Sequence, residues 1–191
     1  MNIISCNVMI SSFVQYGHPE DAVNLFEHIQ NEGIIQPDKV TFLGITKACS
    51  ALSDIGRGIL IHASIICYGY GNDVVLMTSL IHMYGKCGDL ALANEVLRQL
   101  PEQNAGSWNA LIGGYAIQNG REKEVFDIFE HMQKQRIEAD EDVYVTILQV
   151  CGKIKDAERA SYFHSHTIGS GYERDLVVGN ALIKMYAEIE N

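Results

Sequence analysis

Cysteine and histidine are the residue types of this chain best suited to metal or nucleophilic chemistry, but their spacing argues against both. The five cysteines are widely separated in the sequence, with no CxxC pair and an odd total, which disfavours a disulfide framework and a zinc knuckle. His62 and His164 recur at equivalent places, yet neither has a carboxylate or a second ligand four residues later. We therefore expect both rings to pack, and we expect Cys49 and Cys151, on an apolar stripe, to be inert core thiols.

Short polar side chains offer a different chemistry, that of hydrogen bonding. When the sequence is shifted by 102 residues it comes into register with itself, and eight of the sixteen residues from 69 to 84 are identical to their counterparts. The same shift brings Asn7 onto Asn109 and Asp73 onto Asp175. Asn and Asp are preferred at the starts of helices, where their side chains accept backbone N–H groups. Capping of helix starts is therefore an alternative role for these residues.

The elements that position these residues are predicted to be helices. Apolar residues follow the i, i+3, i+4, i+7 spacing of a helix with one buried face, as in Cys6, Met9, Ile10 and Phe13, and no strand-like alternation competes. Short amphipathic hairpins cannot bury their apolar faces alone, so they must stack side by side. The sequence predicts an all-α protein, an α-solenoid of stacked helix-turn-helix hairpins.

Composition limits the classes of function. The chain has 191 residues, of which 47% are hydrophobic and 20% charged, so it can bury a substantial core and is not expected to be disordered. Lys and Arg number 14 against 24 Asp and Glu, a net charge of −10, so any nucleic-acid binding must be local rather than driven by bulk positive charge. No stretch reaches the roughly 18 apolar residues of a membrane span, and a soluble protein is expected.

Boundaries placed at recurrent Asp or Asn residues divide the chain into repeating units. The units are 3–38, 39–73, 74–104, 105–140, 141–175 and a partial unit, 176–191. The first and fourth units are equally long, as are the second and fifth, and the third is the shortest complete unit. Because the sequence starts and finishes abruptly within this pattern, we expect a piece of a longer array.

These units resemble pentatricopeptide repeats (PPRs). Residues 7–10 (Asn-Val-Met-Ile) with the tail 33–38, and residues 108–112 (Trp-Asn-Ala-Leu-Ile), resemble P-type repeats. Residues 47–49 (Lys-Ala-Cys) resemble the L-type repeat, and residues 80–89 resemble the short S-type repeat. The order P, L, S, P, L, S is typical of the PLS class, which is abundant in land plants. The resemblance implies one PPR array over 1–191 that forms a right-handed superhelix. Arg136 departs from the family pattern, because it stands where such repeats usually have Gly.

The resemblance further implies sequence-specific binding of single-stranded RNA, with one base per repeat and two side chains facing each base. The implied base-recognition residues are Asn7 with Asp38 and Asn109 with Asp140, which favour a pyrimidine, Thr78 with Asn104, which favours adenine, and Asn180 at an incomplete sixth site. Leu43 and Val145 stand at the equivalent place in the L-type repeats and should be weak readers. The expected RNA core is 5′-Y-N-A-Y-N-3′, where Y is a pyrimidine.

The remaining expectations concern contacts and partners. Ile4 and Val75 are expected to sandwich bases, and Lys86 and Lys153 to meet phosphates. No phosphate-binding loop, nucleophile elbow or zinc-deaminase signature occurs, so we expect no enzyme, cofactor or metal. The resemblance implies an adaptor in mitochondrial or chloroplast RNA metabolism, such as C-to-U editing, with a deaminase or other factor supplied in trans. Neither a DNA nor a membrane partner is expected.

Other interpretations stay open at this point. Asn7 and Asn109 could act only through local backbone hydrogen bonds at helix starts, and Asp73 and Asp175 only as caps. The array could instead be a protein-binding scaffold similar to tetratricopeptide arrays, which would suit the −10 charge, although tetratricopeptide units keep a nearly constant length and these units do not. A remnant that binds nothing well is a third possibility.

Overall fold

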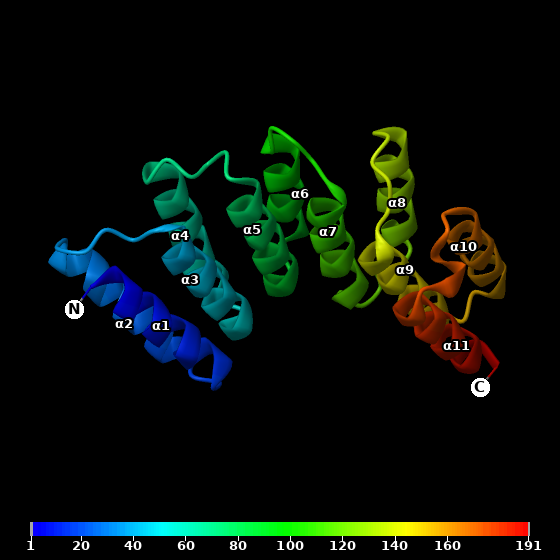
Figure 1. The fold of residues 1–191 in the computed structure, drawn as a ribbon, viewed down its shortest axis with the longest axis horizontal. Helices are drawn as coiled ribbons and strands as arrows, with labels where there is room; N and C mark the ends of the chain where they lie inside the picture. Colours follow the sequence, from blue (N-terminus) through cyan, green and yellow to red (C-terminus); the bar gives the residue numbers. More distant parts are fainter. Residues whose placement is uncertain (1, 191) are drawn as a thin grey trace. The chain divides into compact units, whose positions relative to one another are not determined.

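The computed structural model describes residues 2–190 and consists of helices joined by short turns and loops (Figure 1). Within these residues there are eleven α-helices, one short 3-10 helix and no β-strand. The elements are α1 (Ile3–Gln15), α2 (Pro19–Glu32), α3 (Lys39–Leu52), α4 (Ile55–Cys67), α5 (Val74–Cys87), α6 (Leu90–Gln99), α7 (Ala105–Ile117), α8 (Glu124–Lys134), α9 (Glu141–Ile154), α10 (Ala157–Gly169), η1 (Tyr172–Arg174) and α11 (Leu176–Glu190). None of the described helices is long and apolar enough to cross a membrane.

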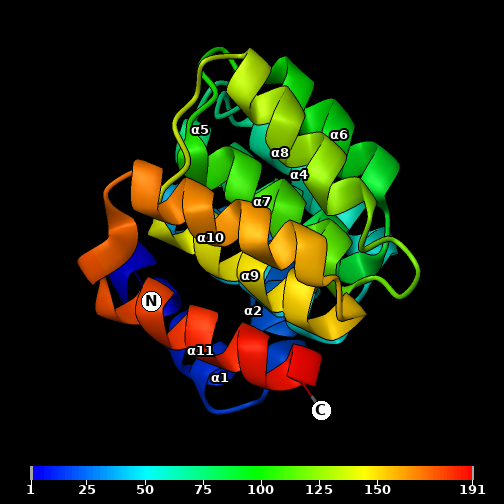
Figure 2. The same ribbon diagram turned by 90° about the vertical axis from the view of Figure 1, so that its right-hand side faces the viewer.

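The helices form two compact units, residues 1–102 and residues 103–191. In the first unit α1 packs on α3 and α3 packs on α5, while α2, α4 and α6 each pair with the helix before them. In the second unit α7 packs on α9 and α9 packs on α11. Figure 2 shows α9 lying beside both α10 and α11. Each unit is therefore a stack of helical hairpins in which the first helices of successive hairpins are neighbours.

The helix starts follow the recurrent acidic residues. The helices α3, α5 and α9 begin directly after Asp38, Asp73 and Asp140, and in each case the Asp side chain accepts a backbone N–H from the first turn. Asp175 does the same before α11, where it accepts the N–H groups of Val177 and Val178 at 2.9 Å. All four residues therefore cap the helices that follow them, which confirms the capping role considered for Asp73 and Asp175 and adds the same role for Asp38 and Asp140. The odd-numbered helices start at the first residues of the six predicted repeats, whose P, L and S types stay a prediction.

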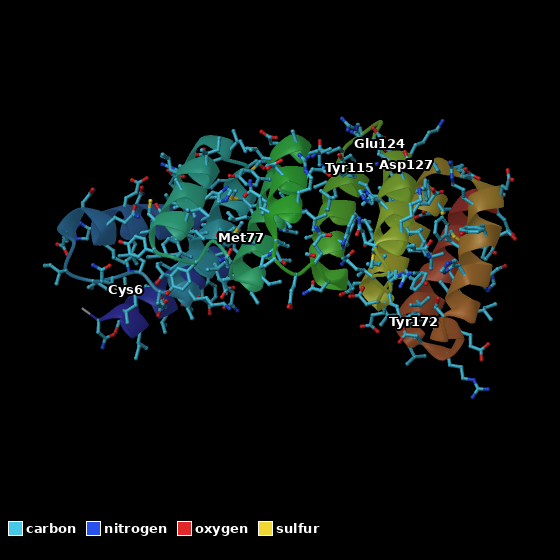
Figure 3. All side chains as sticks on the ribbon, turned by 90° about the horizontal axis from the view of Figure 1, so that it is seen from above. Cys6, Met77, Tyr115, Glu124, Asp127 and Tyr172 are labelled. Atoms are coloured by element: carbon cyan, nitrogen blue, oxygen red, sulfur yellow. The ribbon has the colours of Figure 1, made fainter. Side chains whose placement is uncertain are left out.

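The core of the first unit is built in large part by the stripes seen in the sequence. On α1, Cys6 and Ile10 are fully buried as expected, whereas Met9 on the same stripe exposes 39% of its surface. Phe26 on α2 and Phe42 on α3 are fully buried, with ring centroids 5.8 Å apart. Cys6 and Met77, labelled in Figure 3, lie in the same interior. The helices α1 and α3 approach so closely that a Cβ on Gly44 would stand 2.7 Å from Cγ2 of Ile10. A side chain at Gly44 would push the two first helices apart.

The turn that follows α8 in the second unit is strained, whereas the equivalent turn after α2 in the first unit is not. Gly33 ends α2 with a φ of 66°. Arg136, one residue after the C-cap of α8, adopts a φ of 59° at the place where the repeat pattern leads us to expect glycine. Left-handed backbone is strained for residues with a Cβ. Arg136 therefore forms the same kind of left-handed turn as Gly33, but at a cost in backbone strain.

The histidines and cysteines pack as expected. His62 Nδ1 lies 3.0 Å from the Tyr84 hydroxyl, and the equivalent His164 Nδ1 lies 2.9 Å from the Tyr186 hydroxyl. No group of three or more possible metal ligands occurs within residues 2–190. Cys49 is fully buried, and burial raises the pKa of its thiol to about 12, so it is not a nucleophile at neutral pH.

Candidate nucleic-acid interface

The structure brings Asn7 and Asp38 together. Asn7 lies in the second turn of α1, and its Nδ2 donates to Oδ1 of Asp38, the N-cap of α3, over 2.9 Å. The hydroxyl of Thr41 lies 2.7 Å from Asn7 Oδ1 and 3.0 Å from Asp38 Oδ1, and it accepts the Asp38 backbone N–H at 3.1 Å. The interpretation of Asn7 as a mere helix-start residue is wrong, because its partners are side chains of the next hairpin and Asn2 is the N-cap of α1.

Hydrogen bonding keeps Asp38 ionised. Partial burial raises the pKa of its carboxyl, but the Thr41 backbone N–H, the Asn7 amide and the Thr41 hydroxyl outweigh that effect and hold the pKa below its usual value. Thr41 is a residue that sequence reasoning missed. The available signal was a hydroxyl three residues after an N-cap Asp, the spacing of a reciprocal cap.

The second amide and carboxylate pair is arranged differently. Asp140 accepts the N–H of Val143 at 3.0 Å, while Asn109 Oδ1 accepts the Thr146 hydroxyl at 3.3 Å. No hydrogen bond joins Asn109 to Asp140 in the described chain. The physical reason is the residue between them, because Val143 stands where the first unit has Thr41 and offers no hydroxyl to connect the pair. As with Asn7, the partner of Asn109 is a side chain, so local backbone capping does not describe it.

The remaining predicted base readers occupy separate places. Thr78 is half-buried in the second turn of α5, in the first unit. Asn104 belongs to the second unit, where it caps α7 and forms a reciprocal capping box with Ser107. Asn180 is exposed on α11, and Leu43 is half-buried on α3. The pairing of Thr78 with Asn104 joins residues of different units and stays a prediction.

Aliphatic side chains lie exposed at the second residue of several first helices. Ile4 exposes 71% of its surface and Val75 exposes 53%. Val40, which was not singled out from the sequence, also exposes 53%. Such exposed aliphatic groups beside the polar pairs have the character that base sandwiching requires, and that role stays a prediction.

The two predicted phosphate contacts differ in their surroundings. Lys86 is exposed in the last turn of α5. Lys153 Nζ lies 2.8 Å from Glu122 Oε1 and donates to Asn119 Oδ1 over 3.4 Å. The hydrogen bond from Lys153 lowers the pKa of Glu122, so this lysine is already neutralised by a carboxylate of the preceding hairpin. A phosphate would have to compete with Glu122 for Lys153.

Comparison with known proteins places this geometry in a family. The model of a "PPR repeat family" matches residues 1–51, and the model of a "Pentatricopeptide repeat-containing protein" matches residues 75–191, more than half of the chain. The chain belongs to the pentatricopeptide repeat family.

Relatives of this PPR chain come from Arabidopsis thaliana and are longer proteins. A chloroplastic PPR-containing protein is 34% identical over 182 residues, which is 95% of this chain and 34% of the relative. A second PPR-containing protein is 30% identical over 187 residues, 98% of this chain and 31% of the relative. A mitochondrial one is 30% identical over 187 residues, 98% of this chain and 18% of the relative. The chain thus spans about a third or less of the curated relatives it matches.

Solved PPR structures share the fold. Maize PPR10 superimposes with a TM-score of 0.75 at 21% identity, covering 98% of this chain and 27% of that one. PPR10 in complex with an 18-nt psaJ RNA element gives 0.71 at 19% identity, covering 100% and 26%. The PPR domain of Arabidopsis thaliana protein-only RNase P 1 in complex with tRNA gives 0.67 at 14% identity, covering 97% and 98%. The predicted all-α solenoid fold is confirmed.

Proposed function

We propose that this PPR chain binds single-stranded RNA through the first-helix face of its hairpins, reading bases with paired side chains. The observation that carries the proposal is the joined Asn7–Asp38 pair, together with exposed aliphatic side chains on the same two helices, Ile4 on α1 and Val40 on α3. The support from outside the chain is that PPR10 and the PPR domain of protein-only RNase P 1, which share its fold, are RNA-bound in their structures.

The chemistry of the pair suits a base with a carbonyl at its edge, and the preference for a pyrimidine among such bases is what the family resemblance implies. Asn7 has two amide hydrogens, and the bond to Asp38 uses one of them. Asn7 is buried, with 9% of its surface exposed. We propose that its second amide hydrogen donates through this small exposed part to a carbonyl of a base edge, while Asp38 fixes the orientation of the amide by accepting its other hydrogen. An amide held in this way donates in a known direction, which a base with an acceptor at that point satisfies and a base with a donor does not.

The finer features of the proposal follow the repeat order. We assign the chain to the PLS class, with repeats 3–38, 39–73, 74–104, 105–140, 141–175 and 176–191, and we expect the target core 5′-Y-N-A-Y-N-3′. We place the protein in a mitochondrion or chloroplast, because several relatives are named for one or the other. The role proposed for the chain is binding, and a chemical step such as C-to-U editing would come from a deaminase acting in trans.

The test compares two RNAs at one stated salt concentration, because phosphate contacts make affinity salt-dependent. One RNA carries UNAUN, and the other carries G at the A and at both U positions. We expect tighter binding of the first in a fluorescence-anisotropy titration, by about tenfold if one or two base contacts each contribute ~1 kcal/mol. Equal affinity would overturn sequence-specific binding and favour a protein-binding scaffold.

A further inference from the structure

The two P-type base sites have opposite surroundings at equivalent positions. The internal repeat relates the first-unit residues Lys39, Val40 and Thr41 to the second-unit residues Glu141, Asp142 and Val143. The cationic Lys39 corresponds to the anionic Glu141, the aliphatic Val40 to the anionic Asp142, and the hydroxyl-bearing Thr41 to the aliphatic Val143. The polar pairs themselves, Asn7 with Asp38 and Asn109 with Asp140, are unchanged.

Charge is the first difference. Lys39 Nζ forms an ion pair with Asp73 at 2.8 Å, which neutralises that carboxylate beside the first site. The equivalent residues of the second unit are both acidic, Glu141 and Asp175. The negative charge of Asp175, together with that of Asp142, raises the pKa of Glu141, so these carboxylates lie close enough to repel one another. A phosphate approaching this edge meets repulsion that the first site does not present.

The surface for a base is the second difference. At the first site Ile4 and Val40 offer exposed aliphatic groups, 71% and 53% exposed. The equivalent residues at the second site are Gly106, which has no side chain, and Asp142, which is exposed and charged. Neither provides the apolar contact that holds a base between two first helices. A base at the second site would therefore be oriented only by Asn109 and Asp140, which no mutual hydrogen bond connects in the described chain.

We infer that Val40 and Thr41 make the Asn7–Asp38 site selective, whereas their counterparts Asp142 and Val143 make the Asn109–Asp140 site tolerant of the wrong base. Asp142, with Glu141 beside it, is the residue that most weakens base discrimination in the second unit. This inference rests on the proposed function, because it ranks two base sites that the function requires. It predicts that the first pyrimidine of the target core is read strictly and the fourth base loosely.

The first experiment measures each site separately with the full chain. Two variants of the UNAUN RNA carry G at the first or at the fourth position, and their dissociation constants are measured by fluorescence anisotropy at one salt concentration. We expect a loss of affinity of about tenfold for G at the first position and less than about twofold at the fourth. Equal losses at the two positions overturn the inference and leave the proposed function standing. No loss at either position overturns both.

The second experiment restores the first-unit pattern in the second unit with the triple variant Glu141→Lys, Asp142→Val, Val143→Thr. Its discrimination at the fourth position should rise to about that at the first, and Asp142→Val alone should give part of the gain. The charge-matched control is Glu158→Lys, Asp127→Asn, at exposed positions on α10 and α8 (Figure 3 labels Asp127). The control should raise affinity for all RNAs alike. The same gain in discrimination from the control, or none from either test variant, overturns the inference.

Discussion

Thr41 is the residue whose removal tests the central hydrogen-bond network most sharply. The change Thr41→Val keeps the shape and the β-branch of a fully buried side chain but deletes its hydroxyl. That hydroxyl accepts the Asp38 backbone N–H at 3.1 Å and donates its single hydrogen to Asn7 Oδ1, the nearer acceptor at 2.7 Å. Deletion thus leaves one donor and one acceptor without their partners in a part-buried place.

The magnitude follows from these two bonds. A typical intramolecular hydrogen bond contributes ~0.5–1.5 kcal/mol, so the loss should lie at about 1–3 kcal/mol, with a centre near 2. For a chain of this size a loss of ~2 kcal/mol lowers the midpoint of thermal unfolding by about 4–8 °C. The Asn7 amide should also lose its fixed orientation, so discrimination at the first RNA position should weaken.

The assay is urea unfolding followed by far-UV circular dichroism, with thermal melts in parallel. The matched control is Thr146→Val. The Thr146 hydroxyl is half-exposed, donates to the Asp142 carbonyl of its own helix at 2.9 Å and lies farther, 3.3 Å, from Asn109 Oδ1. The control should cost about 0.5 kcal/mol or less. If Thr41→Val costs no more than Thr146→Val, the network does not stabilise the hairpin junction and the reasoning is wrong.

Three further predictions follow from single features of the structure. Because the pKa of Asp38 is lowered in the folded chain, its contribution to stability is fully present at neutral pH and begins to be lost below about pH 4. The urea midpoints of wild type and Asp38→Asn should therefore differ most near pH 7 and converge as pH falls through the lowered pKa of Asp38. Arg136→Gly should raise the free energy of unfolding by about 0.5–1 kcal/mol by relieving the left-handed turn, and a lower melting temperature would contradict this. Cys67 is exposed and should react with a thiol reagent in the folded chain, whereas Cys49 is buried and should react only after unfolding. Mass spectrometry of the labelled peptides measures this, and labelling of Cys49 but not of Cys67 in the folded chain would contradict it.

Local features of this fold could be predicted from the sequence because each depends on residues close together in the chain. An Asp followed by an amphipathic stretch specifies a helix start, and Asp38 and Asp140 both cap the helices that follow them. The apolar stripes likewise identified much of the core, as Cys6, Ile10 and Cys49 show, although Met9 lies exposed. These signals need no knowledge of which hairpins meet.

The details of the candidate site could not be predicted in the same way because they depend on contacts between hairpins. Asn7 and Asn109 look equivalent in the sequence, yet only Asn7 bonds its partner carboxylate, since Thr41 and Val143 differ. Similarly, the sequence predicts Lys153 as a phosphate contact but gives no sign of its ion pair with Glu122. In both cases a neighbour from another hairpin, distant in the sequence, decides what the side chain can do.

The measurement that tests base reading most directly exchanges one pair for another within the same chain. The double variant Thr78→Asn, Asn104→Asp gives these two positions the residues that we propose read a pyrimidine in place of those that we propose read adenine. Asp caps a helix as well as Asn does, so α7 should still form. Binding is measured to RNAs that differ only at the third position, A or U, at one salt concentration. We predict that the preference moves from A toward U. An unchanged preference for A in a folded variant that still binds RNA would contradict the account.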